Sequence, residues 1–312
     1  MDPVIENTPS SRHKLITLLM VVIALVAFAA NSILCRLALV DQTIDAASFT
    51  IIRLTSGAFL LFVLVQFLPR PKKPDHLVLR PLKSRKLWIA PLMLFAYALF
   101  FSYAYHQLTT ATGALILFVT VQLTMIGYQI YKGQRFTQLE WFGIVIAISG
   151  FIILLLPDLA QPSLLGAGLM ILSGIAWALY TLEGRGSQTP LRDTAENFLG
   201  TLPLCFALLI VTVWFAELSL QGTLLAIASG AFASGVGYSV WYYVVPRISI
   251  SLAAVSQLSV PLLAAVGGVV LVDEVITLPL VIAGLLIIGG IAVVSLSKSQ
   301  SPEALERSPN NH

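Results

Sequence analysis

The stretch "GALILFVTVQLTMIGYQIYKGQRFTQLEWFGIVIAISG" (113–150) holds two apolar runs that are joined by a short basic break. A similar pattern, "SLAAVSQLSVPLLAAVGGVVLVDEVITLPLVIAGLLIIGG", occupies 251–290, with acids in its break. Gly150 aligns with Gly290 when a one-residue gap is allowed. A repeat over this distance indicates that the chain contains two copies of a larger unit.

The composition around these runs is that of a protein that uses lipid as its solvent. Hydrophobic residues make up 57% of the chain and charged residues only 11%, whereas soluble domains carry about 25% charged residues. The mean hydropathy is +0.89. The formal net charge of +3 is small, so we expect no nucleic-acid partner.

A membrane-spanning helix needs roughly 20 apolar residues. The runs of this kind are 15–40, 46–68, 87–106, 111–131, 138–156, 164–183, 194–216, 221–243, 249–271 and 277–296. The first run is longer than the apolar region of a secretory signal peptide, so we expect it to be a permanent helix.

The charges between the runs predict an orientation. Cytoplasmic loops carry an excess of Lys and Arg. With the N-terminus inside, all of the 18 Lys and Arg residues except Arg36 and Arg53 fall in inner segments. The outer segments hold only acids, which are Asp41, Asp45, Asp158, Glu217, Asp273 and Glu274. The charge pattern therefore predicts a multi-pass membrane protein with both termini in the cytoplasm, and we expect the membrane to be a bacterial inner membrane.

The repeat and the run count together predict the fold class. Alignment of the two copies places run four on run nine and run five on run ten, so each unit has five helices. Because five is odd, the second unit enters the membrane upside down relative to the first. The predicted architecture is an all-α polytopic membrane protein whose ten transmembrane helices form two inverted five-helix repeats, a plan typical of secondary transporters. The expected segments are a cytoplasmic tail (1–14), the two repeats (15–156 and 157–296) and a second cytoplasmic tail (297–312).

Several stretches resemble the EamA-type transporters of the drug/metabolite transporter superfamily. The stretches are "FAANSILCRLAL" (28–39), "FTIIRLTSGAFLL" (49–61), "ATGALILFVTVQLT" (111–124), "GIAWALYTLEGR" (174–185) and "SISLAAVSQLSVPLLAAV" (249–266). Two departures concern architecture: Gln134 replaces the family's acid in the first break, and helix four lacks the proline that Pro261 keeps in helix nine. The resemblance implies alternating-access transport of a small organic metabolite, with export the commoner direction.

Arg53 is the charge that is hardest to explain by lipid-facing helices. It lies seven residues after Ala46, which is roughly 10 Å along a helix. A charge near the bilayer centre costs about 2.5–3.5 kcal/mol, so its side chain must face protein or water. One interpretation is an anchor for a substrate carboxylate, which a guanidinium binds in bidentate fashion. The other is a structural pair with backbone carbonyls or with Asp41 or Asp45.

The other candidate substrate-binding residues are small polar or aromatic side chains within the runs. They are Asn31, Ser32, Tyr97, Trp177, Tyr180, Tyr238 and Gln257. Asn31 and Ser32 suit either helix association or a cavity wall. The aromatic residues suit either stacking on a solute or core packing. Gln257 precedes Pro261 by one helical turn and either contributes to a site or repairs the hydrogen bond that proline removes.

Four residues near the outer ends are candidates for a gate or vestibule. They are Arg36, Asp41, Asp45 and His106. Arg36 either extends to the interface, as long cationic side chains do, or closes a gate with Asp41 or Asp45. His106 either senses pH or is simply solvated.

The sequence contains none of the motifs for ATP hydrolysis, zinc proteolysis or the usual serine hydrolysis. We therefore expect a transporter that is not an enzyme and binds no cofactor or metal, with a small-molecule substrate and the lipid bilayer as partners, as a monomer or homodimer.

We expect Arg53 together with the aromatic residues to favour amino acids or related carboxylates as substrates. The alternatives are a non-transporting membrane receptor or scaffold and an intramembrane lipid-modifying enzyme, for which no nucleophile or acid–base pair is found at depth.

Overall fold

The computed structural model describes residues 11–67, 86–133, 136–155, 163–184, 187, 189–244, 256–257 and 259–299. The helices of the first half are α1 (Ser11–Val40), α2 (Ala46–Gln66), α3 (Lys86–Tyr105), α4 (Thr110–Tyr131) and α5 (Gln138–Leu155). Those of the second half are α6 (Leu164–Gly184), α7 (Pro190–Gly200), α8 (Leu202–Thr212), η1 (Val213–Phe215), α9 (Leu220–Ile227), η2 (Ala228–Val236), α10 (Gly237–Val244), α12 (Ser259–Val272) and α13 (Leu278–Ser299).

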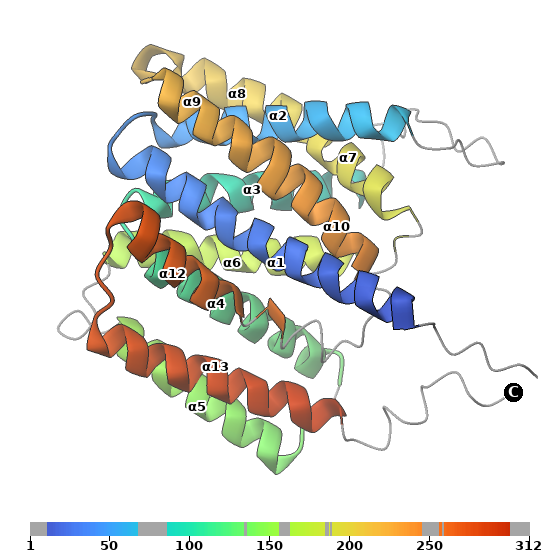
Figure 1. The fold of residues 1–312 in the computed structure, drawn as a ribbon, viewed down its shortest axis with the longest axis vertical. Coiled ribbons are helices and arrows are strands. Elements are labelled where there is room, and N and C mark those ends of the chain that lie inside the picture. The colour runs from blue at the N-terminus through green and yellow to red at the C-terminus, as the bar shows by residue number, and fades with distance from the viewer. Residues whose placement is uncertain are drawn as a thin grey trace, which may run out of the picture.

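These elements form ten apolar spans. Seven helical stretches in the described part of the chain are long and apolar enough to cross a membrane, and three shorter apolar helices bring the sum to ten. The seventh span joins α7, α8 and η1, and the eighth joins α9, η2 and α10. The expected all-α, ten-helix architecture is confirmed, and the helices lie roughly parallel to one another (Figure 1).

Local sequence explains the two irregular spans. Pro203 lies in the first turn of α8 and has no N–H to donate, so the seventh span breaks between Gly200 and Leu202. The eighth span changes from α to π geometry over Ala228–Val236. Segments of π-helix frequently occur at functional sites.

The packing of the spans relates the two halves of the chain. Helix α3 packs against α6, and the eighth span packs against α1 in the equivalent way. In the same way, α4 packs against α6 and α12 packs against α1. Two further contacts join equivalent helices of the two halves, α4 with α12 and α5 with α13. Exchanging spans one to five with spans six to ten preserves this pattern, as two inverted repeats require.

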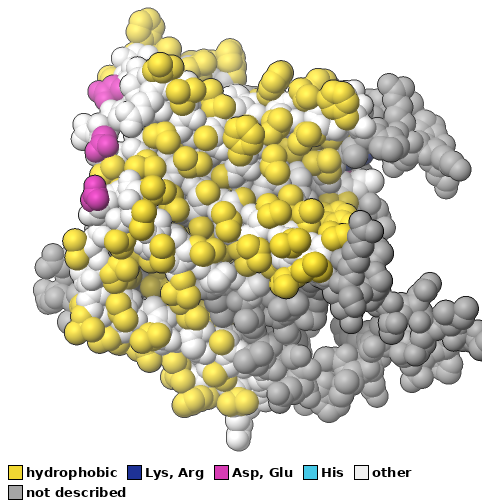
Figure 2. Space-filling view, viewed as in Figure 1, with side chains coloured by type: hydrophobic (Ala, Val, Ile, Leu, Met, Phe, Trp, Pro, Cys, Tyr) yellow, Lys and Arg dark blue, Asp and Glu magenta, His cyan; other side chains and the backbone are white. Residues whose placement is uncertain are grey.

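Charge separates the two ends of the bundle. The turns at one end carry Asp41, Asp45, Glu217, Asp273 and Glu274, and we call it the acidic end. Figure 2 shows acidic side chains at this end and a wide apolar surface along the helices. Helix α1 begins and α13 finishes at the opposite end (Figure 1). Lys132, after α4, and Arg192, in the first turn of α7, lie there too, and we call it the basic end.

Candidate functional site

Arg53 lies at the centre of the bundle and is 1% exposed. Its Nε donates to Ser234 Oγ at 3.2 Å, and its Nη2 donates to the hydroxyls of Tyr97 (3.1 Å) and Tyr238 (3.2 Å). Its Nη1 has no hydrogen-bond partner among the described residues. No described carboxylate pairs with this guanidinium, so the pairing with Asp41 or Asp45 that one interpretation proposed is absent.

Aromatic rings provide part of the compensation for the buried charge. The guanidinium carbon is 5.2 Å from the ring centre of Tyr97 and 5.0 Å from that of Phe101. Such cation–π contacts stabilise a cation by about 0.5–2 kcal/mol each. They do not replace the counter-ion that a buried charge normally has.

A network of uncharged polar side chains joins Arg53 to α1. Asn31 Nδ2 donates to the hydroxyl of Tyr97 at 3.2 Å. Asn31 Oδ1 accepts from Ser229 Oγ at 2.6 Å and from Ser234 Oγ at 3.5 Å. The hydroxyl of Tyr238 also donates to that of Tyr97, at 3.2 Å. The network therefore fixes α1, α2, α3 and the eighth span to one another around a single tyrosine hydroxyl.

The eighth span supplies Ser229 and Ser234 because its backbone is π-helical there. Residues five apart are about 140° apart around an α-helix, which has 3.6 residues per turn. Hydrogen bonds in a π-helix join residues five apart, so the same spacing brings the two side chains to one face. A Cβ on Gly230 would collide with the backbone oxygen of Arg53. Because glycine has no Cβ, this face of the eighth span can pack directly against the backbone of α2.

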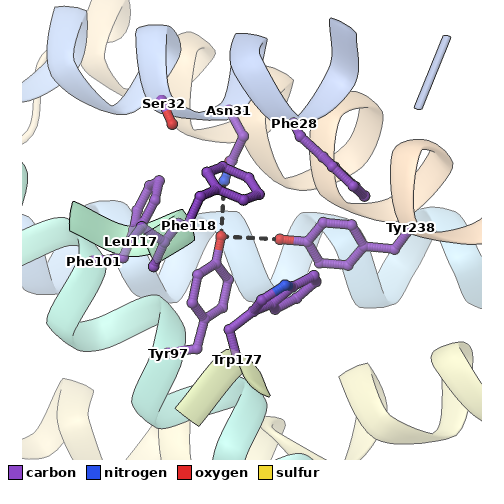
Figure 3. A pocket seen from close by; sticks show the side chains of 9 residues that line it. All are labelled: Phe28, Asn31, Ser32, Tyr97, Phe101, Leu117, Phe118, Trp177 and Tyr238. Atoms are coloured by element: carbon purple, nitrogen blue, oxygen red, sulfur yellow. Dashed lines mark hydrogen bonds between the residues drawn. The ribbon is translucent and has the colours of Figure 1, made fainter. Parts of the chain in front are cut away.

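A small cavity lies beside this network (Figure 3). Its lining residues are Phe28, Asn31, Ser32, Tyr97, Phe101, Leu117, Phe118, Trp177 and Tyr238. The ring of Trp177 lies 4.7 Å from that of Tyr97 and 4.8 Å from that of Tyr238, centre to centre. The cavity volume is about 10 Å³, which is room for about one water molecule. A larger molecule can enter only if these side chains move.

The structure brings most of the predicted binding residues together. Asn31, Ser32, Tyr97, Trp177 and Tyr238 line the cavity, and Arg53 bonds to two of them. Tyr180 is buried and packs on Trp177, with ring centres 5.5 Å apart, but it does not line the cavity. Gln257 is half-buried and also lies outside the lining.

Sequence reasoning missed four apolar lining residues and both serines of the eighth span. The apolar residues are Phe28, Phe101, Leu117 and Phe118. They resemble ordinary core positions, and nothing in the sequence distinguishes them. A signal for the serines exists in "ASGAFASG" (228–235), where Ala-Ser-Gly occurs twice at a spacing of five residues.

Arg36 pairs with a partner that was not expected. Its Nε donates to Glu274 Oε1 at 3.0 Å and its Nη1 to the backbone oxygen of Tyr105 at 2.9 Å. Of the two interpretations, neither describes this structure: the side chain is only 15% exposed and so does not extend to the interface, and its partner is not Asp41 or Asp45. Glu274 belongs to the turn between α12 and α13, which the fold brings to the end of α1.

The other gate candidates have simpler surroundings. Asp45 begins α2, where its carboxylate accepts from the backbone nitrogen of Ser48 (2.9 Å) and from that of Glu217 (3.0 Å). This is the usual role of an aspartate at a helix N-terminus. Asp41 and His106 are exposed in turns at the acidic end. Neither contacts the cavity.

Relatives of the chain agree with this architecture. The EamA-like transporter family matches residues 15–156 and 164–296. The chain is 46% identical to an uncharacterized protein of Pseudomonas aeruginosa, over 89% of this chain and 94% of that protein. It is 26% identical to an uncharacterized transporter of Archaeoglobus fulgidus, over 64% of this chain and 72% of that protein.

A solved crystal structure shares the fold. The TM-score is 0.60 at 21% identity, covering 89% of this chain and 99% of the other. The two family matches each cover one half of the described bundle, and together they span most of the chain. The chain therefore belongs to the EamA-like transporter family and is a multi-pass membrane transporter of small molecules.

Proposed function

We propose that this transporter moves small organic metabolites that carry a carboxylate, with amino acids the first class to test. The observation that carries this proposal is Arg53, a buried guanidinium with three hydroxyl partners, a free Nη1 and no counter-ion among the described residues. A substrate carboxylate would supply the missing negative charge. The proposed site is the cavity wall together with Arg53.

Electrostatics favours this assignment over a purely structural role. An arginine that only joined helices would be expected to have a carboxylate partner, because an unpaired buried charge is strongly unfavourable. Here hydroxyls and ring faces hold the guanidinium in place without neutralising it. A carboxylate that reached Nη1 would form a charge-assisted hydrogen bond, which is about twice as strong as a neutral one.

The rest of the cavity suits the remainder of such a substrate. Trp177, Tyr238 and Phe28 surround the space with aromatic faces, while Asn31 and Ser32 offer polar groups from α1. The present volume accommodates no metabolite, so binding requires the helices to separate. We propose that the two halves then open the site in turn towards each end of the bundle, with export the working direction. In this proposal the basic end and both termini face the cytoplasm of a bacterial inner membrane.

The test is uptake of radiolabelled solutes into proteoliposomes that contain the purified chain. The panel comprises amino acids, other small carboxylates and nucleosides, and the nucleosides serve as solutes without a carboxylate. We expect flux for at least one carboxylate and none for the nucleosides. Flux of the nucleosides alone would contradict the carboxylate assignment.

A matched pair of variants connects the result to Arg53. Arg53→Lys keeps a positive charge but removes the planar fork, whereas Arg53→Met removes the charge at a similar volume. We expect flux to fall by about a hundredfold or more in Arg53→Met and by less in Arg53→Lys. If no carboxylate crosses although the protein is folded, the proposed substrate class is contradicted and the non-transporting scaffold interpretation gains support.

A further inference from the structure

At the acidic end, a guanidinium and a helix N-terminus bind the carboxylate of Glu274. Glu274 Oε1 accepts from Arg36 Nε at 3.0 Å. Both oxygens of Glu274 also accept from the backbone nitrogen of Thr110, at 2.9 and 2.8 Å. Thr110 is the first residue of α4, so the carboxylate lies at a helix N-terminus beside a guanidinium. Both features attract anions.

This position has further properties of a built binding site. The side chains of Arg36 and Glu274 are only 15% and 9% exposed. The hydroxyl of Thr110 is buried and has no hydrogen-bond partner among the described residues. A Cβ on Gly268 would lie 2.5 Å from Glu274 Oε2 and 3.3 Å from Thr110 Oγ1. Because glycine has no Cβ, there is room here for the carboxylate of Glu274 beside the first residue of α4.

The site lies about one helical turn from the cavity, on the side of the acidic end. Arg36 follows Ser32 by four residues on α1, and Tyr105 follows Phe101 by four residues on α3. Residues four apart share one face of a helix, and both Ser32 and Phe101 line the cavity. Arg36 also donates to the backbone oxygen of Tyr105. One helical turn above the cavity, α1 and α3 are thus joined to each other and to Glu274.

We propose that Arg36 and the N-terminus of α4 form a second carboxylate site, which Glu274 occupies while the acidic end is closed and which the substrate carboxylate occupies as it passes. This step rests on the proposed function for the identity of the passing ligand. Exchange of one carboxylate for another keeps Arg36 paired throughout. Glu274 is tied to the α12–α13 turn, so its displacement frees this turn from α1 and α4 and opens the acidic end.

The experiment uses the full chain in detergent with one reporter cysteine. Cys35→Ala and Cys205→Ala remove the native thiols, and Ser32→Cys places a thiol in the cavity wall. The rate of its alkylation by N-ethylmaleimide measures opening. We expect Glu274→Ala to raise the rate at least tenfold. The matched control is Asp273→Asn, which removes a charge from the same turn at an exposed side chain and should leave the rate unchanged.

Acetate then tests whether the vacated site binds a free carboxylate. We expect sodium acetate to return the Glu274→Ala rate towards that of the parent, while sodium chloride at equal ionic strength does not. The double variant Arg36→Ala with Glu274→Ala should show no acetate effect. Melting temperatures identify variants that are merely unfolded, and Glu274→Gln provides a milder version of the same change.

Two outcomes would overturn the inference. One is a Glu274→Ala or Glu274→Gln protein that is alkylated as slowly as its parent, since Glu274 would then close nothing. The other is fast alkylation that acetate does not slow. The alkylation assay needs no transported substrate. If acetate slows alkylation but no carboxylate is transported, the site at Arg36 is supported and only the proposed substrate class is contradicted.

Discussion

The contact between α5 and α13 and the contact between α2 and the eighth span are both very close, but they are made of different chemistry. A Cβ on Gly290 would lie 2.5 Å from the oxygen of Gly143 and 2.6 Å from the nitrogen of Ala147. A Cβ on Gly230 would collide with the oxygen of Arg53. The first contact is surrounded by small and apolar residues, whereas the second surrounds a buried charge.

If the proposed function holds, this difference separates a contact that serves stability from one that serves transport. Tight packing of small residues is a usual way to join helices in lipid, and nothing in the α5–α13 contact requires a ligand. A charge without a counter-ion costs stability and persists where function needs it. Changes at α5–α13 should therefore act on folding, and changes around Arg53 should act on flux.

The largest expected effect is on folding, at Gly290. A Gly290→Leu side chain would overlap the backbone of α5, so we expect a loss of about 3 kcal/mol or more and a poor yield of folded protein. Gly289→Leu is the matched control, because a Cβ there meets nothing within 4 Å. Thermal unfolding in detergent compares the two variants, and equal melting temperatures would contradict the tight-contact account.

The second prediction is that a change at Arg53 lowers flux without lowering the stability of the fold. Removal of a buried charge that has no counter-ion leaves no unpaired charge behind and also removes the cost of keeping that charge out of water. We therefore expect Arg53→Met to have an unchanged or higher melting temperature although its carboxylate flux is lost. A large fall in melting temperature would instead make Arg53 a structural residue.

The third prediction concerns the π-helical segment. Insertion of one alanine after Phe232, whose side chain is 66% exposed, puts Ser229 and Ser234 six residues apart and turns Ser234 and Tyr238 away from Asn31. We expect flux to fall at least tenfold, whereas Phe232→Ala, which keeps the chain length, should transport normally. Normal flux in the insertion variant would mean that the alignment of Ser229 and Ser234 is not needed.

The smallest expected effect is at Trp177. Trp177→Phe keeps an aromatic ring but removes part of the stacking surface next to Tyr97 and Tyr238. Aromatic pairs contribute about 0.5–1.5 kcal/mol, which corresponds to about a two- to tenfold rise in KM with little change in maximal flux. A fall in maximal flux at constant KM would assign Trp177 to the conformational change instead of binding.

Much of the fold followed from patterns that are local in the sequence. Run length, charge in the breaks and the odd number of helices per repeat were enough for the ten-span plan. Depth along a helix was enough to select Arg53, Asn31 and Tyr97, because a polar group far from a helix end must face protein. These inferences need no knowledge of how the helices cross.

The remaining features depend on helix crossings and rotation. Arg36 and Glu274 are 238 positions apart, so their pairing is visible only once α12 packs against α1. Asp41 and Asp45 were closer in the chain and looked like better partners, but Asp45 is used to begin α2. Ser229 and Ser234 share a face only because the eighth span is π-helical, which an α-helical reading of the sequence hides.

The most direct test of the central claim compares a carboxylate with its uncharged amide. The measurement is the shift in melting temperature that each member of an acid–carboxamide panel causes in the wild-type chain and in Arg53→Met. The account predicts at least one acid that stabilises the wild-type protein while its amide does not, and no stabilisation of Arg53→Met by either. Equal shifts for an acid and its amide, or acid binding that survives in Arg53→Met, would contradict it.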